Sequence, residues 1–541
     1  SKLSNDDMYQ GLVDKEPHQF WNAWKNLNKC KISSAPRIDG CVNDNDIASA
    51  FSETFSNVYT NNDSSAHGIH KQEFCSAYYT YFNECVNDVI SNHYFSWDDM
   101  LSVVSKLKPG KCFSGFMKPE HVLHGSPKLM SHLHILFNGM LQHSFVPTDF
   151  LRGAISPVVK DNEGDLTSSS NYRPITLCSV FAQMYEQAIR IKIGHLLYST
   201  DLQFGFKKGH STVHALYTLK TTVNYFTSRS SSVFVAFMDC TKAFDRISHY
   251  ALFAKLMKRK VPLCFLSLII FWYLNMCVNC KWNGTFSEYF DVPSGSKQGG
   301  ILSPEFFSLY VNDLIVLLKR TGLGCHIMMM FLAAILFADD LALLAPSRGV
   351  LQFMINICHS YCKMYCLEFN PKKTKVMVFG KLSGKPDLYP LYLGERRIDY
   401  VDEWRYLGTT VVSGGKLSFS IQNELRKFYG ALNSILGVLV KPPEQISMKL
   451  LYSNCVPILS YACGVKDLLS KDMQRMNTAI NDGIRKIFSF QRWESTRHLR
   501  EAFHYPSIEV IFARGKRNLE SSLLLVGNNV LSHLYYNFVV D

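Results

Sequence analysis

The sequence has little of what marks a disordered or a secreted chain. Charged residues make up only 19% of its 541 positions and hydrophobic residues 47%, which excludes a mainly disordered protein. The 16 cysteines are scattered, without the density or spacing of a disulfide framework. No cleavable signal segment opens the chain, which begins at Ser1. We therefore expect an intracellular protein with no disulfide-linked partner, and a piece of a longer chain.

Hydrophobic runs long enough to cross a bilayer are also lacking. The almost wholly apolar run 263–278 is shorter than the roughly 20 residues that a membrane helix needs. The longer run 327–345 contains Asp339 and Asp340 near its centre, and two adjacent carboxylates in hydrocarbon are costly without cationic partners. We expect no membrane association, and a buried helix and a buried hairpin instead.

Positive charge, by contrast, is in surplus. The formal net charge is +12 at pH 7. A surplus of this size favours a polyanionic partner, but it is equally consistent with an ordinary basic soluble protein.

Hydrophobic periodicity predicts a mixed α/β block between two helical regions. A Ser-x-x-Asp capping box at Ser96 marks the start of one helix. In the middle of the chain strands alternate with helices, as in an α/β or α+β palm-like sheet. The expected helices are 46–59, 129–144, 175–197, 304–320 and 351–366. The expected strands are 150–159, 232–239, two within 333–345, 375–380 and 406–412, and only helices are expected after Gly415.

Three carboxylates give the sharpest chemical signal. Asp239 ends a predicted strand, and Asp339 and Asp340 stand at a predicted hairpin tip. Carboxylates gathered among apolar residues repel one another unless cations lie between them, and hard oxygen ligands favour Mg²⁺. Two such ions would serve phosphoryl transfer. The alternative is that each aspartate is an ordinary turn residue.

Eight segments, read together, resemble the reverse transcriptases of non-LTR (LINE-type) retrotransposons, especially jockey-like elements. They occur in the order of that family, and several are individually only moderately specific. The segments are SPVVK, NYRPITL, QFGFKKGHST, FMDCTKAFDRISH, GSKQGGILSP, FADDLALLAPS, FNPKKTKVMVFG and RYLG. The resemblance implies a right-hand polymerase with fingers, palm and helical thumb, and an RNA-directed DNA polymerase that copies retrotransposon RNA.

The resemblance also implies a set of catalytic residues. Asp239, Asp339 and Asp340 match the metal-binding triad for two Mg²⁺ ions, with Mn²⁺ as the alternative, and the Cys240 carbonyl matches an extra ligand. Lys373 matches the lysine thought to protonate pyrophosphate.

Further residues match the nucleotide-binding part of the family site. Lys160 and Arg173 correspond to cations that grip the incoming triphosphate. Phe244, five residues after Asp239, corresponds to an aromatic gate against a ribose 2′-hydroxyl. Gln298 and Gly299 correspond to the loop beneath the templating base pair.

The rest of the chain is divided by the same resemblance. Tyr406, Leu407 and Gly408 match the primer grip, and the helical tail matches the thumb. The implied units are an N-terminal helical extension 1–95, fingers with part of the palm 96–231, palm 232–412, and thumb with C-terminal region 413–541. The implied partners are an RNA template, a DNA primer or target and dNTPs, in the nucleus or cytoplasm. No segment resembles the endonuclease that normally precedes this polymerase.

Other interpretations remain open. Phe337 replaces a commoner Tyr, and the run 328–330 of three methionines replaces more polar residues, so a catalytically inactive nucleic-acid-binding descendant is the alternative function. An RNA-dependent RNA polymerase is disfavoured by Phe244. Cys277 and Cys280 form a lone pair with no second half of a zinc site. Cys358, Cys362 and Cys366 share one predicted helical face, where we expect buried thiols.

Overall fold

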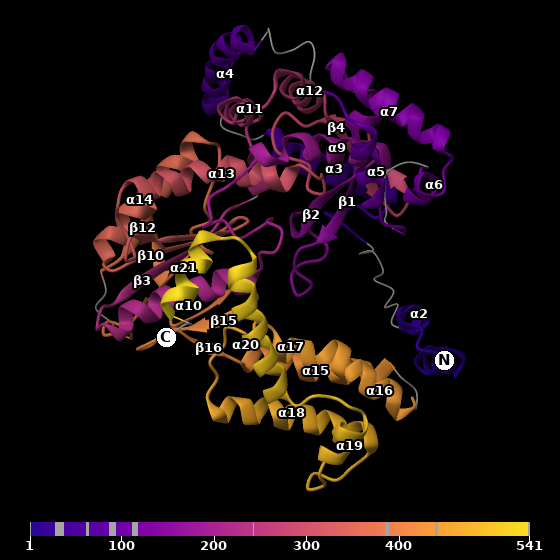
Figure 1. Ribbon diagram of the computed structural model, residues 1–541, viewed down its shortest axis with the longest axis vertical. Helices are drawn as coiled ribbons and strands as arrows, with labels where there is room; N and C mark the ends of the chain where they lie inside the picture. Colours follow the sequence, from indigo (N-terminus) through magenta and orange to yellow (C-terminus); the bar gives the residue numbers. More distant parts are fainter. Residues whose placement is uncertain are drawn as a thin grey trace.

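A six-stranded sheet lies between a helical layer at one end of the molecule and a helical C-terminal unit at the other (Figure 1). The computed structural model describes residues 2–27, 37–60, 64–85, 93–110, 117–241, 243–384, 389–438 and 442–538. The layer at the top of Figure 1 contains α4 (Ser64–Cys85), α7 (Pro127–Gln142), α11 (His249–Lys258) and α12 (Leu263–Leu274). The unit at the bottom contains α15 (Gln422–Val438), α16 (Glu444–Leu450), α17 (Val456–Ser460), α18 (Ser470–Phe488), α19 (Arg497–Ala502) and the start of α20 (Ile508–Leu525).

The six-stranded sheet is built around β3 (Val233–Asp239). Every residue of β3 before Asp239 is buried, because β10 (Asp340–Ala345) and β11 (Lys375–Phe379) pair with it on either side, both antiparallel. The strand order is β12 (Leu391–Leu393), β13 (Arg396–Tyr400), β11, β3, β10 and β9 (Ala334–Phe337). Helices α10 (Thr212–Ser228) and α14 (Arg348–Met364) pack against the sheet. The predicted strand 232–239 and the predicted hairpin within 333–345 are confirmed.

A second sheet forms beside it from β1 (Arg152–Val159), β2 (Tyr172–Cys178) and β4 (Cys277–Trp282), joined by the short β5 (Thr285–Phe286) and β6 (Phe290–Asp291). β1 pairs antiparallel with β2 and parallel with β4. Helix α3 (Asp44–Thr60) packs on this sheet, and Phe51 contacts the rings of Tyr172 and Trp282.

The prediction of one long helix over 175–197 is wrong. Residues up to Cys178 belong to β2, and helix α9 (Val180–Ile193) begins only after Ser179, whose hydroxyl accepts a hydrogen bond from the Ala182 amide. The β-branched Ile175 and Thr176 pair with β1, which no local periodicity reveals. The other helix predictions are confirmed by α3, α7, α13 (Ser303–Arg320) and α14.

Other local predictions also hold. Helix α5 (Trp97–Ser105) begins with the expected capping box, in which the Asp99 amide donates to Ser96 Oγ (3.2 Å) and the Ser96 amide donates to Asp99 Oδ2 (2.7 Å). The apolar run 263–278 contains α12 and the first residues of β4. Among the described helices, none is both long enough and apolar enough for a bilayer crossing.

The region after Gly415 is not wholly helical, as we expected it to be. Strand β16 (Ser418–Ser420) adds a third strand to the small sheet of β14 (Glu403–Tyr406) and β15 (Thr409–Val412), and α15 follows it. The remaining elements are α1 (Lys2–Val13), α2 (Pro17–Leu27), α6 (Pro119–Leu123), α8 (Thr148–Leu151), η2 (Ser169–Asn171), η3 (Gly194–Leu196), η4 (Ala243–Arg246), β7 (His326–Ile327), β8 (Met330–Phe331), η5 (Leu451–Cys455) and α21 (Asn529–Phe538).

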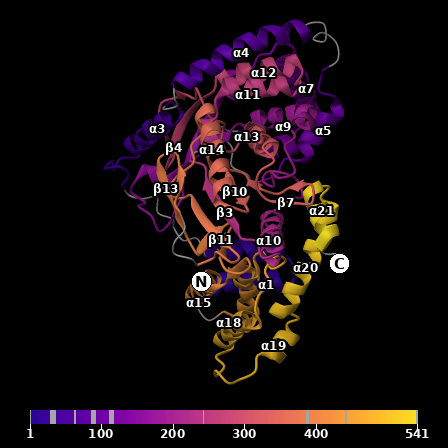
Figure 2. The same ribbon diagram turned by 90° about the vertical axis from the view of Figure 1, so that its left-hand side faces the viewer.

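The helices described within the first 95 residues pack against three different parts of the protein. Phe20 and Trp24 of α2 share an apolar cluster with Phe428 of α15 and with α18, whereas α3 joins the cluster around the second sheet. Helix α4 packs on α11. Figure 2 shows α1 near the C-terminal helices and α3 and α4 at the other end. The division into units at residues 95, 231 and 412 stays a proposal.

Candidate active site

The three predicted carboxylates stand at the end of the six-stranded sheet, on neighbouring strands. Asp239 is the last residue of β3, and Asp340, the first residue of β10, is its direct partner across the antiparallel pair. Asp339 lies in the turn between β9 and β10, next to Ala338, whose φ of 57° is in the left-handed region. Neighbouring strands therefore bring together residues that are a hundred positions apart in the sequence.

The turn that carries Asp339 is braced by the segment 203–206. Gln203 Oε1 accepts hydrogen bonds from the amides of Ala338 (3.2 Å) and Gly205 (2.9 Å). A Cβ on Gly205 would lie 2.3 Å from the Ala338 nitrogen, so the close approach requires glycine. No structural role is predicted from the sequence for the segment QFGFKKGHST, which begins at Gln203, because nothing local in it points to a hairpin far along the chain.

Burial and mutual repulsion disfavour the charged forms of two of the carboxylates. The pKa of Asp340 is raised to about 7, first by burial and then by the charges of Asp339 and Asp239. Burial is also the main cause that raises the pKa of Asp339, while Arg173 and Lys373 oppose the rise. The Lys373 ammonium lies 3.4 Å from Asp239 Oδ2. The three carboxylates thus repel one another, and the neighbouring cations offset the rise of the Asp339 pKa only in part.

A cavity of about 700 Å³ opens beside these carboxylates. The predicted site residues that line it are Lys160, Arg173, Asp239, Cys240, Phe244, Gln298, Asp339 and Lys373. The predicted residues outside its lining are Asp340, Gly299, Tyr406, Leu407 and Gly408. Its volume is within the range of cavities that bind small molecules.

The two predicted triphosphate-binding cations come from the hairpin of β1 and β2. Lys160 follows β1, its amide donates to the Asn171 carbonyl (2.8 Å), and its ammonium donates to the Ser170 carbonyl (2.7 Å). Arg173 is the second residue of β2, and its charge helps to lower the pKa of Asp339. Both cations line the cavity at the same end of this hairpin.

Phe244 is held by two other rings. It stacks on Phe307 of α13, with ring centroids 4.6 Å apart, and meets Phe206 edge-on at 5.8 Å. Its carbonyl accepts a hydrogen bond from the Ser296 amide (2.7 Å). The ring is therefore both a packing residue and part of the cavity wall.

The loop of Gln298 and Gly299 is fixed by contacts to two other segments. Gln298 Nε2 donates to Asp245 Oδ1 (2.7 Å), and the Gln298 carbonyl accepts from the Thr176 amide (2.8 Å). Gly299 has a φ of 127°, and a Cβ there would lie 2.6 Å from the Thr176 carbonyl oxygen. Our sequence analysis missed Asp245, although it follows directly after Phe244 in the quoted motif.

Asn370 is a second residue that our sequence analysis missed. Its amide donates to the Asp239 carbonyl (2.8 Å), and its Oδ1 accepts from the Lys372 amide (3.0 Å). These bonds join the turn that carries Lys373 to the end of β3. The Asn-Pro pair that opens this turn is the signal that could have identified it.

The predicted primer-grip residues form the turn of the β14–β15 hairpin. The ring of Tyr406 packs on the six-stranded sheet, with its centroid 4.7 Å from that of Phe237 in β3. Leu407 and Gly408 both have positive φ, and the Tyr461 hydroxyl donates to the Leu407 carbonyl (2.9 Å). None of the three residues lines the cavity.

Residues 159–411 match the family described as reverse transcriptase (RNA-dependent DNA polymerase). The chain contains a reverse transcriptase domain. The matched region mixes helix and sheet, and it includes both strands that carry the aspartates. Homologous proteins from non-LTR retrotransposons agree with the resemblance that the eight segments carry.

The chain is 24% identical over 66% of its length to the probable RNA-directed DNA polymerase from transposon BS of Drosophila melanogaster, and this match covers 40% of that protein. It is 22% identical over 76% of its length to the RNA-directed DNA polymerase from mobile element jockey of Drosophila funebris, covering 46% of it. The chain therefore spans less than half of these relatives.

Solved telomerase structures are distant neighbours of this chain. One is the telomerase of Candida albicans in complex with a fragment of telomeric RNA. The alignment covers 70% of this chain and 65% of the telomerase chain, with 12% identity and a TM-score of 0.35. The corresponding Candida tropicalis complex covers 72% of this chain, and 65% of it is covered, with 13% identity and a TM-score of 0.37.

Cys358, Cys362 and Cys366 are buried, as predicted, but only Cys358 and Cys362 share a face of α14, because this helix ends at Met364. Burial raises the pKa of the Cys358 and Cys362 thiols. Across the described residues, no group of three or more His, Cys, Asp and Glu side chains is arranged to hold a metal ion. Cys277 and Cys280 therefore belong to no such group among these residues.

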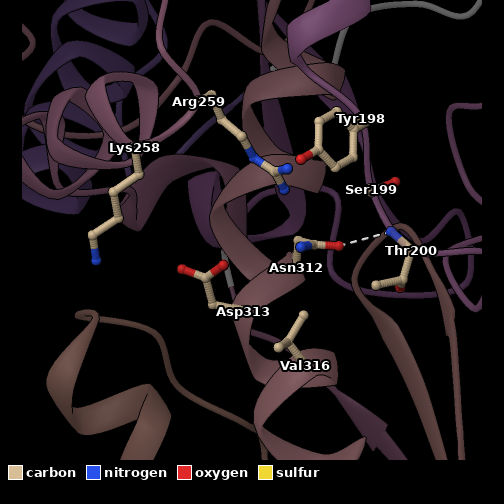
Figure 3. A pocket seen from close by; sticks show the side chains of 8 residues that line it. All are labelled: Tyr198, Ser199, Thr200, Lys258, Arg259, Asn312, Asp313 and Val316. Atoms are coloured by element: carbon tan, nitrogen blue, oxygen red, sulfur yellow. Dashed lines mark hydrogen bonds between the residues drawn. The ribbon is translucent and has the colours of Figure 1, made fainter.

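A second cavity, of about 410 Å³, lies between the end of α11, the middle of α13 and residues 198–200 (Figure 3). The guanidinium of Arg259 stacks on the ring of Tyr198, 3.8 Å from its centroid, and Asn312 Oδ1 accepts from the Thr200 amide (2.8 Å). Its lining contains no residue of the predicted site. These contacts join α11 and α13 to residues 198–200, which precede the segment of Gln203 that holds the Asp339 turn.

Proposed function

We propose that this chain is an RNA-directed DNA polymerase that copies retrotransposon RNA at the 700 Å³ cavity. The observation that supports it most is the cavity of a reverse transcriptase domain that Asp239, Asp339, Lys160 and Arg173 all line. Asp340 lies directly beside it, as the cross-strand partner of Asp239. The proposed partners are an RNA template, a DNA primer or target, and dNTPs. The proposed fingers, palm and thumb are residues 96–231, 232–412 and 413–541, with 1–95 as the N-terminal extension.

Reverse transcriptases generally use divalent metal ions. The donor chemistry fits Mg²⁺: hard carboxylate oxygens, with the pKa of Asp339 and Asp340 raised by burial and by neighbouring charge. Asp239, Asp339 and Asp340 would hold the ions, with the Cys240 carbonyl as an additional ligand. Bound Mg²⁺ would activate the primer hydroxyl and stabilise the leaving oxygen.

The chain's own residues would orient the other reactants. Lys160 and Arg173 bind the triphosphate, because two cations at one end of the cavity compensate its charge. Lys373, held beside Asp239 by the Asn370 turn, is placed to give a proton to the departing pyrophosphate. Phe244 excludes a 2′-hydroxyl by contact with the sugar.

Other residues would position the nucleic acid. The loop of Gln298 and Gly299 lies beneath the templating base pair, where the required glycine keeps the backbone close to β2. Tyr406, Leu407 and Gly408 support the primer strand from below the palm sheet. The C-terminal helices follow the duplex as a thumb.

Two other functions compete with this proposal. An inactive nucleic-acid-binding descendant is favoured by the exposed Met328 and Met329, which are 66% and 96% exposed. An RNA-dependent RNA polymerase would need room beside Phe244 for a 2′-hydroxyl.

Extension of a DNA primer on an RNA template by the purified protein tests the proposal. With Mg²⁺ and dNTPs we expect full-length DNA, and with rNTPs little product. Binding of the primed template without extension would support the inactive descendant. Equal extension with rNTPs would support an RNA polymerase.

A further inference from the structure

Helix α3 contributes a wall to the cavity, although it lies outside the matched reverse transcriptase domain at 159–411. Thr54, Phe55, Asn57 and Val58 line the cavity, in the last two turns of the helix. Phe55 is buried and stacks on Phe51, which anchors this part of α3 on the second sheet. The helix is therefore fixed against the fold and reaches the cavity with side chains that the family match does not include.

A hydroxyl pair joins α3 to the segment that positions Lys160. Thr54 Oγ1 and Ser169 Oγ lie 2.9 Å apart, 115 positions apart in the sequence. Ser169 begins η2, and the carbonyl of the next residue, Ser170, accepts the hydrogen bond from the Lys160 ammonium. The same turn is held again from the N-terminal side, because the Ser169 amide donates to Asp39 Oδ1 (3.1 Å).

The end of α3 also contacts the other side of the cavity. Ser294 Oγ donates to the Tyr59 carbonyl (2.5 Å), and Ser294 is four residues before Gln298. Tyr59 is buried beside Asp245, which accepts the Gln298 side chain. One helix thus touches both the turn that positions Lys160 and the loop that contains Gln298.

We propose that Thr54 is a positioning residue for nucleotide binding, which acts through Ser169 on the turn that fixes Lys160. This proposal rests on the proposed polymerase function and adds a residue from outside the matched domain to it. Because Thr54 acts on the turn and not on the carboxylates, its loss should weaken binding of the incoming dNTP and leave the chemical step unchanged.

The test compares Thr54→Val, which keeps the shape and removes the hydroxyl, with Thr54→Ser, which keeps the hydroxyl. Thr60→Val is the matched control, since Thr60 lies on the same helix and its hydroxyl donates to the Ser56 carbonyl of that helix (2.9 Å). KM and kcat for single-dNTP addition, the Kd of a primed RNA template and the melting temperature are measured for each. Equilibrium binding of a fluorescent dNTP to the protein–template complex is measured in parallel.

We expect Thr54→Val to raise KM and the dNTP Kd about three- to tenfold, the range of one neutral hydrogen bond. kcat, the template Kd and the melting temperature should stay close to those of wild type. Thr54→Ser should restore the dNTP Kd, and Thr60→Val should not change it. Ser169→Ala should reproduce Thr54→Val, and the double variant should be no worse than either single one. If Thr54→Val does not fold, Ser169→Ala replaces it.

An unchanged dNTP Kd in Thr54→Val would overturn the proposal, and so would a fall in kcat and melting temperature without a change in KM. A wild-type protein that adds no dNTP would instead refute the polymerase function. The equilibrium dNTP titration would still decide the role of Thr54 in that case, and the absence of dNTP binding to wild type would overturn both.

Discussion

Phe244 shows how one side chain serves both packing and the proposed selection of the sugar. Its ring is stacked on Phe307 and contacts Phe206, and it also lines the cavity that contains Asp239. Discrimination by such a ring would come from a clash with the 2′-hydroxyl and not from an added attraction. A smaller side chain should therefore admit ribonucleotides.

We expect Phe244→Val to raise the ratio of rNTP to dNTP incorporation efficiency about tenfold or more, with some loss of overall rate. Single-nucleotide incorporation measured with both substrates gives this ratio. A melting curve serves as the control, because loss of the Phe307 stack also removes packing energy, about 1 kcal/mol beyond the buried area. A folded Phe244→Val protein with an unchanged ratio would refute the gate.

At this scale the sequence was informative where a motif is contiguous and uninformative where a partner is distant. Asp239, Asp339, Lys160 and Lys373 could be named before the structure, and the cavity brings them together. Gln203 could not be named as their support, because its contact with Ala338 joins segments that only the fold makes adjacent. Asp245 and Asn370 stand inside quoted motifs, but their partners Gln298 and Asp239 are equally distant in the sequence.

At the scale of elements, the β14–β15 hairpin is the joint between the palm and the C-terminal helices. The Tyr461 hydroxyl donates to the Leu407 carbonyl in its turn and lies 2.8 Å from Thr212 Oγ1 on α10. The hairpin is held again by Glu424 of α15, which accepts from Thr409 Oγ1 (3.2 Å) and from the buried ammonium of Lys466 (2.8 Å). From these contacts we expect movement of the C-terminal helices to be coupled to the proposed primer grip.

Tyr461→Phe should reduce the length of DNA made in one binding event several-fold and leave single-nucleotide addition within about twofold of wild type. The reason is that one hydrogen bond, worth about 0.5–1.5 kcal/mol, then no longer fixes the hairpin turn to the helices. Product lengths measured with an excess of unlabelled trap template report this. Tyr79→Phe, at an exposed position of α4, is the control. Unchanged product lengths in Tyr461→Phe would contradict the coupling.

Elements with a strong local pattern could be predicted, and those defined by pairing could not. The hairpin of β9 and β10 follows from two apolar stretches separated by polar turn residues. Strand β2 was mistaken for the start of α9, because its apolar spacing continues into that helix and only pairing with β1 distinguishes the two. Strand β16 is three residues long and exists as the partner of β15.

At the scale of the whole molecule, the buried apolar residues that the structure describes form three clusters, and segments far apart in the sequence share a cluster. The N-terminal helices α1 and α2 pack with the C-terminal helices, and α3 packs with the second sheet. Such long-range packing leaves no local signal. The surplus of positive charge is the global property that the sequence does report, and its proposed role is binding of the nucleic-acid backbone.

The net charge of +12 leads us to expect binding of an RNA–DNA hybrid that weakens steeply with salt. Each neutralised phosphate releases counterions, so six or more contacts should lower the affinity at least about a thousandfold between about 50 and 200 mM salt. A titration of labelled hybrid at several salt concentrations gives the slope. A flat dependence would mean that the surplus charge is an ordinary solvated surface.

The most direct test of the central claim is primer extension on RNA by Asp239→Ala, with hybrid binding measured on the same preparation. The matched control is Asp291→Ala, which removes an exposed carboxylate of β6 in the second sheet. We expect Asp239→Ala to lose about 100-fold or more in extension rate, with a hybrid Kd within about threefold of wild type, and the control to remain active. Extension by Asp239→Ala within about tenfold of wild type would contradict the assignment of the catalytic site.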